Sequence, residues 1–213
     1  MDRAAIILAG GSSQRFGSDK GLVQLAGKPL ISHVIERVRD LVDEVIICVR
    51  KENQLTSYSQ ALPDNFRVIA DINDLPPCPL TGAITGFMST NSEYAAILPC
   101  DTPFISGRVV DLLFNIAVNV DAVIPRWPND YIEPLQAVYR TEAALDASRR
   151  AIEKGERRMW SMISLLKSVR YISTIVIREI DPEMLTFFNI NTPLDLRKAE
   201  AIIRRKLAVK GKP

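Results

Sequence analysis

The residues best suited to chemistry lie near the start of the chain, where a short apolar run ends in glycine. Residues 4–9 are apolar and of strand length, Gly10-Gly11-Ser12-Ser13 follows, and Arg15 and Lys20 come next. Paired glycines let the backbone approach a ligand closely and turn successive N–H groups toward one anion. An arginine fork and a lysine ammonium add positive charge for that anion. The pattern predicts a phosphate-binding loop; the alternative is a glycine-rich turn with two solvated cations.

The spacing within this loop excludes two common phosphate-binding motifs. Lys20 is followed by Gly21 and lies too far from Gly10 and Gly11 to complete Gly-x4-Gly-Lys-Ser/Thr. The pattern Gly-x-Gly-x-x-Gly is also missing from the sequence. Neither a Walker loop nor a Rossmann dinucleotide turn is therefore predicted.

Apolar runs of strand length alternate with helical periodicities after the loop. This order predicts an α/β fold, a doubly wound, mainly parallel sheet with helices on both faces. Because no internal repeat or linker interrupts the order, residues 1–213 are expected to form a single domain. Strands are expected at residues 4–9, 45–49, 67–70, 95–100, 121–125, 134–139, 172–177 and 186–190. Helices are expected at residues 30–42, 54–62, 80–90, 106–118, 143–154, 159–166 and 193–207.

Two carboxylates follow strands of this expected sheet. Asp71 comes directly after the strand at residues 67–70, and Asp101 after the strand at residues 95–100. Ligands of open parallel sheets bind beyond the carboxyl ends of the strands, where the glycine loop also lies. A single Asp after a strand is commonly a helix N-cap. Two of them beside a phosphate loop favour a functional site.

Several motifs along the chain together resemble one family of nucleotidyltransferases, the molybdenum cofactor guanylyltransferases. The loop from Leu8 to Lys20 is similar to the family's first motif, and Gly27-Lys28-Pro29-Leu30 to the segment after it. The other matching segments are Pro79-Leu80-Thr81-Gly82, Cys100-Asp101-Thr102-Pro103-Phe104, Glu133–Tyr139, Gly155-Glu156-Arg157-Arg158 and Phe188-Asn189-Ile190-Asn191-Thr192-Pro193. Each motif alone is weak, but the combination covers nearly the whole chain and is specific.

This resemblance implies a reaction of GTP with molybdopterin-bound molybdenum that forms the guanine dinucleotide cofactor and pyrophosphate. It implies that Lys20 contacts phosphate and that Asp101 binds both the nucleotide and Mg2+. The positive charge of Arg15 in the predicted phosphate loop makes it a further catalytic candidate beside Lys20 and Asp101. Asn189 and Asn191 are expected on the pterin side or in support of the metal; the alternative is that they cap the final helix. The residues matched to GTP binding are Leu8, Ala9, Gly10, Gly11, Lys20, Asp71 and Asp101.

The charges of such a reaction agree with these residue types. A phosphate oxygen attacks the α-phosphorus while pyrophosphate leaves, and both reactants are anions, so catalysis is mainly positioning and neutralisation of charge. Mg2+ is usually held by one or two carboxylates and by phosphate oxygens, which suits Asp101. The expected partners are GTP, molybdenum-molybdopterin, and molybdoenzyme acceptors or other cofactor-biosynthesis proteins, without nucleic acid or membrane.

Some residues depart from the family pattern, and other functions stay open. Val49-Arg50-Lys51 stands where the family usually has an Asn that meets the nucleotide, Cys78 where it has Gly, and Glu133 where it often has His. These departures concern the choice of base and the pterin contacts. The alternatives are a cytidylyltransferase that uses CTP, a phosphosugar nucleotidyltransferase, and a non-catalytic module that binds GTP and delivers the cofactor.

Composition limits the class of protein. The formal net charge is +2, from 27 Lys and Arg against 25 Asp and Glu, which gives no nucleic-acid footprint. Cys48 and Cys100 lie in or beside apolar runs and are expected to be buried free thiols; no zinc-site spacing occurs. The N-terminal apolar run is too short for a signal peptide, so a cytoplasmic location is expected.

Overall fold

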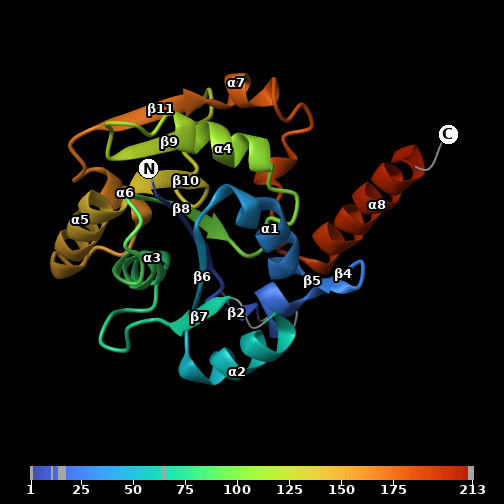
Figure 1. Ribbon diagram of the computed structural model, residues 1–213, viewed down its shortest axis with the longest axis horizontal. Helices are drawn as coiled ribbons and strands as arrows, with labels where there is room; N and C mark the ends of the chain where they lie inside the picture. Colours follow the sequence, from blue (N-terminus) through green and yellow to red (C-terminus); the bar gives the residue numbers. More distant parts are fainter. Residues whose placement is uncertain (1, 11, 14–17, 64–65, 211–213) are drawn as a thin grey trace.

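The computed structural model of the chain describes residues 2–10, 12–13, 18–63 and 66–210. Seven strands form one central sheet in the order β7-β6-β1-β8-β10-β9-β11 (Figure 1). Their bounds are β1 Arg3–Leu8, β6 Glu44–Val49, β7 Arg67–Ala70, β8 Tyr94–Pro99, β9 Ala122–Arg126, β10 Ala137–Arg140 and β11 Val169–Ser173. This mostly parallel sheet confirms the predicted fold class.

The centre of the sheet is buried on both faces. β1 pairs in parallel with β6 and with β8, and its inner residues Ala4 to Ile7 have no exposed surface. Continuous apolar runs are typical of parallel strands that are covered on both sides. β10 is the exception in direction, because it runs antiparallel to both of its neighbours, β8 and β9.

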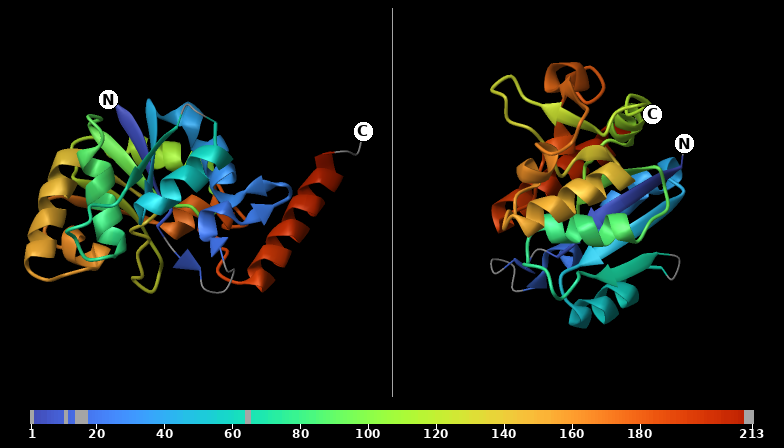
Figure 2. Two further views of the ribbon diagram at one scale, coloured as in Figure 1. Left: turned by 90° about the horizontal axis from the view of Figure 1, so that it is seen from below. Right: turned by 90° about the vertical axis from the view of Figure 1, so that its left-hand side faces the viewer.

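Helices cover the sheet from both sides, so that the core has two layers (Figure 2). One layer contains Ile7 and Ile47 of the sheet, and the other contains Ile6 and Ile46, as the alternation of strand side chains requires. The first layer is covered by α1 Leu30–Val38, α2 Glu52–Ala61, α4 Gly107–Asn115 and α7 Thr174–Arg178. The second is covered by α3 Pro79–Met88, α5 Thr141–Glu153 and α6 Met159–Ile163.

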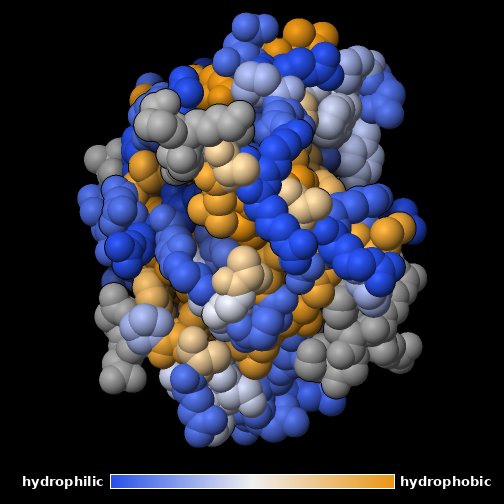
Figure 3. All heavy atoms as spheres, turned by 90° about the vertical axis from the view of Figure 1, so that its right-hand side faces the viewer, coloured by the Kyte–Doolittle hydropathy of each residue, from blue (hydrophilic) through white to orange (hydrophobic). Residues whose placement is uncertain are grey.

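A third, smaller cluster joins the last helix to the start of the chain. α8 Pro193–Lys210 extends away from the sheet (Figure 1), and its Ala199 packs with Leu25, Leu30, Phe104 and Ile190. Viewed from that side, hydrophobic residues lie among hydrophilic ones (Figure 3). The short elements of the described chain are β2 Ser12–Ser13, β3 Ser18–Asp19, β4 Gln24–Leu25, β5 Lys28–Pro29 and the 3-10 helices Lys20–Leu22, Arg39–Leu41 and Leu185–Phe187. None of the described helices is both long and apolar enough to span a membrane.

Two expected strands near the end of the chain are wrong. Residues 186–190 form no strand: the N–H of Thr186 donates to Asp181 Oδ2 at 2.7 Å, and its carbonyl accepts from Gln136 Nε2 at 3.0 Å. These side chains take the place of a strand partner. The expected strand at residues 172–177 ends at Ser173, whose hydroxyl accepts from the N–H of Ile175 at 3.2 Å and caps α7.

Candidate active site

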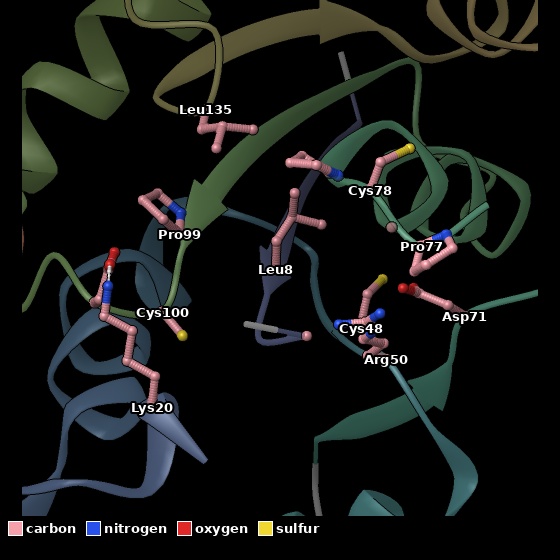
Figure 4. Close-up of a pocket in the computed structure, with 14 residues that line it drawn as sticks. Leu8, Lys20, Cys48, Arg50, Asp71, Pro77, Cys78, Pro99, Cys100 and Leu135 are labelled. Carbon is pink, nitrogen blue, oxygen red and sulfur yellow. Dashed lines mark hydrogen bonds and ion pairs between the residues drawn. The ribbon is translucent and has the colours of Figure 1, made fainter. Parts of the chain in front are cut away.

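A cavity of about 320 Å³ lies at the carboxyl ends of the four strands β7, β6, β1 and β8. This is the edge at which parallel sheets bind ligands. Leu8 lies in the middle of the cavity, between Leu135 and Pro99 on one side and Pro77 and Asp71 on the other (Figure 4). The residues that line it are Leu8, Gly10, Lys20, Cys48, Arg50, Asp71, Pro77, Cys78, Pro79, Gly82, Pro99, Cys100, Asp101 and Leu135.

Three distant segments meet at one end of the cavity. The Nζ atom of Lys20 forms an ion pair with Asp101 Oδ2 and donates to Asn191 Oδ1 at 2.6 Å. The side chains of Lys20 and Asp101 are only 14% and 13% exposed, so solvent screens their charges weakly. The structure therefore brings together a cation, a carboxylate and an amide that sequence analysis had placed in separate motifs.

Backbone contacts hold this cluster in place. The N–H of Ile190 donates to the carbonyl of Asp101 at 3.0 Å, which ties the segment before α8 to the end of β8. The side chain of Gln54 donates to Asp19 Oδ1 at 2.7 Å, next to Lys20. Sequence analysis missed Gln54, because no local pattern links residues that lie 35 positions apart.

The two asparagines of the last motif have different places. Both are exposed and neither is among the lining residues, but the side chain of Asn191 accepts from Lys20. The alternative interpretation, in which Asn191 caps α8, is wrong. The cap is Thr192: its hydroxyl accepts from the N–H of Asp195 at 3.2 Å, and Asp195 Oδ2 accepts from the N–H of Thr192 at 2.9 Å.

Asp101 has a second oxygen that is available to a ligand. Its Oδ1 atom is buried and has no hydrogen-bond partner within the part of the chain that the structure describes. A buried acceptor without a partner costs free energy, which a bound cation or donor would recover. Carboxylate oxygens are the ligands that hard divalent cations prefer, so this atom fits a metal ion.

Asp71 marks the opposite end of the cavity. Burial raises the pKa of Asp71 to about 6, although the positive charge of Arg50 lowers it. Its Oδ1 atom is also buried without a hydrogen-bond partner among the described residues. A Cβ atom added to Gly82 would lie 3.5 Å from this oxygen and 3.1 Å from Leu8 Cδ2, so glycine keeps this end of the cavity open.

The first glycine of the loop allows a close approach between two strand ends. A Cβ atom on Gly10 would lie 3.0 Å from the Cβ of Arg50 and 3.2 Å from its backbone nitrogen. Ala9 is buried, and its N–H donates to the carbonyl of Cys48 at 2.8 Å. Leu8 and Gly10 thus line the cavity, whereas Ala9 links the end of β1 to β6 through its backbone hydrogen bond. Gly11 and Arg15 lie outside the described residues.

Arg50, Leu135 and the three cysteines also line the cavity. Sequence analysis had noted Arg50 and Cys78 only as departures from the family pattern. The signal for Arg50 was present, since it directly follows a strand, as Asp71 does. Leu135 could not be found in this way, because it precedes the antiparallel strand β10. Cys48 and Cys100 are buried free thiols, as predicted.

Comparison with known proteins points to one family. A model of the MobA-like NTP transferase domain matches residues 5–169. A protein of Methanosarcina mazei named probable molybdenum cofactor guanylyltransferase is 35% identical, over 97% of this chain and 94% of its own length. The molybdenum cofactor guanylyltransferase of Desulfosudis oleivorans is 34% identical, over 93% and 95%.

Solved structures agree with these relatives. Molybdopterin-guanine dinucleotide biosynthesis protein A from Archaeoglobus fulgidus has a TM-score of 0.81 and 31% identity, and the match covers 95% of this chain and 99% of that one. The 4-diphosphocytidyl-2C-methyl-D-erythritol synthase of Anaerococcus prevotii covers 96% of both chains with a TM-score of 0.71, but at 15% identity it shows only the shared fold.

Proposed function

Since this chain belongs to the MobA-like NTP transferase family and is a nucleotidyltransferase, we propose that it transfers GMP from GTP to molybdenum-molybdopterin. The products are the molybdopterin guanine dinucleotide cofactor and pyrophosphate. The names of its relatives support this choice of substrates. The observation that carries the proposal is the contact of Lys20 with Asp101 and Asn191 at the carboxyl ends of the parallel strands.

The reaction requires two anionic groups to approach each other. An oxygen of the molybdopterin phosphate attacks the α-phosphorus of GTP, the bond from that phosphorus to the bridging oxygen breaks, and pyrophosphate leaves. The Lys20 ammonium would neutralise the charge that develops on the triphosphate, together with Arg15. Pairing with Asp101 and Asn191 fixes the position of the ammonium before substrate binds, which lowers the cost of reorganisation.

We assign GTP binding to the loop and to the two carboxylates. Leu8, Ala9, Gly10 and Gly11 would let the nucleotide lie against the backbone at the end of β1. Asp71 would bind the nucleoside and Asp101 the phosphate end. Asn191 lies next to the ammonium and fits the pterin side of the site, and the same role for Asn189 stays a prediction.

Nucleotidyltransferases of this kind generally use a divalent metal, and Mg2+ is the ion we propose. Asp101 would hold it through the buried Oδ1 atom, since its other oxygen is paired with Lys20. When bound, the ion withdraws charge from the phosphate oxygens. The proposed partners are GTP and molybdenum-molybdopterin, followed by molybdoenzyme acceptors or other cofactor-biosynthesis proteins.

The test is to incubate the purified protein with molybdenum-molybdopterin, Mg2+ and each nucleoside triphosphate in turn. Chromatography of the products and release of pyrophosphate report turnover. We expect the dinucleotide to form with GTP alone. Turnover only with CTP would identify a cytidylyltransferase, and GTP binding without pyrophosphate release would identify a delivery module.

A further inference from the structure

Arg50 holds a place in the sheet that matches those of the other cavity residues. It follows β6, just as Gly10 follows β1 closely, Asp71 follows β7 and Asp101 follows β8. β6 lies between β1 and β7, so Arg50 stands between the glycine loop and Asp71. In Figure 4 Arg50 is drawn near Asp71, where burial raises the pKa of the carboxyl and the positive charge of Arg50 lowers it.

The backbone that carries Arg50 is fixed on both sides. The carbonyl of Cys48 accepts from Ala9 at 2.8 Å, and the carbonyl of Val49 accepts from Asp71 at 2.7 Å. On one side, Gly10 approaches so closely that a Cβ atom there would lie 3.0 Å from the Cβ of Arg50. The guanidinium therefore extends from an anchored backbone, although the side chain itself is exposed and packs in no core.

Arg50 lies two strands away from β8, at whose end the phosphates are proposed to react, and Asp71 lies three strands away. Lys20 and Asp71 lie on opposite sides of Leu8 (Figure 4), and β6 and β1 separate β7 from β8. Three strand spacings amount to about 14 Å, which is enough for a nucleotide to extend between the two ends. With the triphosphate at Lys20 and Asp101, the base reaches Arg50 and Asp71.

The two groups at this end complement the edge of guanine. Guanine presents the acceptors O6 and N7 side by side, which an arginine fork can bind with two hydrogen bonds. Its N1–H and its exocyclic amino group are adjacent donors, and the buried Asp71 Oδ1 lacks a donor among the described residues. We propose that Arg50 reads guanine through O6 and N7, while Asp71 accepts from N1–H and the amino group. This inference rests on the proposed function and names the residue that selects its base.

Nucleotide analogues separate this role from a general attraction to phosphate. 7-Deaza-GTP lacks the N7 acceptor, and ITP lacks the exocyclic amino group. The binding constants of GTP, 7-deaza-GTP, ITP and CTP are measured by calorimetry for the wild type, Arg50→Lys and Arg50→Gln. Arg39→Gln is the matched control, because Arg39 is exposed and lies outside the cavity.

We expect the wild type and Arg39→Gln to bind 7-deaza-GTP about tenfold more weakly than GTP, the effect of one charge-assisted hydrogen bond. Arg50→Gln should bind the two equally, Arg50→Lys should keep part of the preference because its ammonium can still donate to N7, and all four proteins should keep the same penalty for ITP. An unchanged preference for GTP over 7-deaza-GTP in Arg50→Gln overturns the assignment, because this side chain is shorter and uncharged. Equal weakening of all four nucleotides in Arg50→Gln also overturns it, because a phosphate contact would act in that way.

The same measurements distinguish two kinds of failure. If the wild type binds CTP and not GTP, the proposed function fails together with the inference. If the wild type binds GTP and Arg50→Gln keeps its analogue preferences, only the role of Arg50 fails.

Discussion

The ammonium of Lys20 is paired with the carboxylate of Asp101, 81 residues further along the chain, so the first motif and the end of β8 form one charged unit. Both side chains are mostly withdrawn from water. Removal of either partner leaves the other charge without compensation in a weakly screened position. This pair is therefore the first target for substitution.

Asp101→Ala should lower turnover at least about a hundredfold, since it removes the proposed metal ligand and the partner of Lys20. Some GTP binding should remain, because the contacts at the Asp71 end are intact. Steady-state release of pyrophosphate and calorimetry with GTP measure the two effects. Asp146→Ala, which breaks only an exposed ion pair with Arg150 on α5, is the control. Unchanged turnover in Asp101→Ala would refute the assigned role.

Asn191→Ala should reduce kcat about tenfold, because Lys20 loses an acceptor at 2.6 Å that fixes its ammonium. Asn189→Ala is a close comparison from the same motif, and its exposed side chain makes no contact with Lys20. We expect this second variant to leave kcat near the wild-type value and to act, if it contacts the pterin, on the KM for molybdopterin. Equal loss of kcat in both variants would contradict the positioning role of Asn191.

Asp71→Asn should make the protein more resistant to heat at neutral pH. Burial raises the pKa of Asp71 to about 6, so between about pH 4 and pH 6 the folded protein holds a proton that the unfolded chain has released. The free energy of unfolding therefore falls as the pH rises through this interval, and it stays lower above it. The asparagine of the variant does not ionise, so the variant does not lose this free energy of unfolding.

Melting temperatures of the wild type and Asp71→Asn at pH 7.5 and at pH 4 check this expectation. The variant should melt higher at pH 7.5, and the difference should shrink toward pH 4. The same variant should bind GTP more weakly at pH 7.5, since the amide has lost the charge of the carboxylate. A variant that is less stable than the wild type at pH 7.5 would show that the carboxylate is not strained by burial.

Substitutions at two glycines one turn apart on α3 are expected to have different effects, one on stability and the other on the KM for GTP. A Cβ atom at Gly86 would lie 2.3 Å from Ile6 Cγ2, so Gly86→Ala should cost about 1–3 kcal/mol of stability by overpacking. A Cβ atom at Gly82 meets Leu8 at 3.1 Å and points at the Asp71 end of the cavity, so Gly82→Ala should mainly raise the KM for GTP. Urea unfolding and steady-state kinetics on both variants test the contrast, which fails if Gly82→Ala is the less stable of the two.

Much of the fold could be predicted because its central strands are apolar on both faces. Residues 45–49 and 95–100 carry this signal without help from distant residues, and β6 and β8 are found there. Residues 186–190 looked similar in sequence but form no strand, because Asp181 and Gln136 satisfy the backbone of Thr186. Hydrogen bonds from such side chains produce no periodic pattern in the sequence.

Part of the candidate site could likewise be predicted from the sequence, and part could not. Asp71 and Asp101 were placed at strand ends from the sequence, and the structure puts both at the cavity. The link from Lys20 to Asn191 could not be predicted, since it joins residues 171 positions apart through a loop whose conformation depends on α8 and β8. The place of Leu135 at the cavity could not be predicted either, because it depends on the direction of β10. An apolar run does not indicate in which direction its strand runs.

The reversed direction of β10 has a consequence for how this enzyme can diversify. β9 ends and β10 begins at the same edge of the sheet, so the connection between them lies at that edge, and its Leu135 lines the cavity. Insertions or exchanges in such a connection leave the hydrogen-bonded register of both strands unchanged. Selection can therefore reshape the part of the cavity wall around Leu135 independently of the strand ends that carry Asp101 and Asp71.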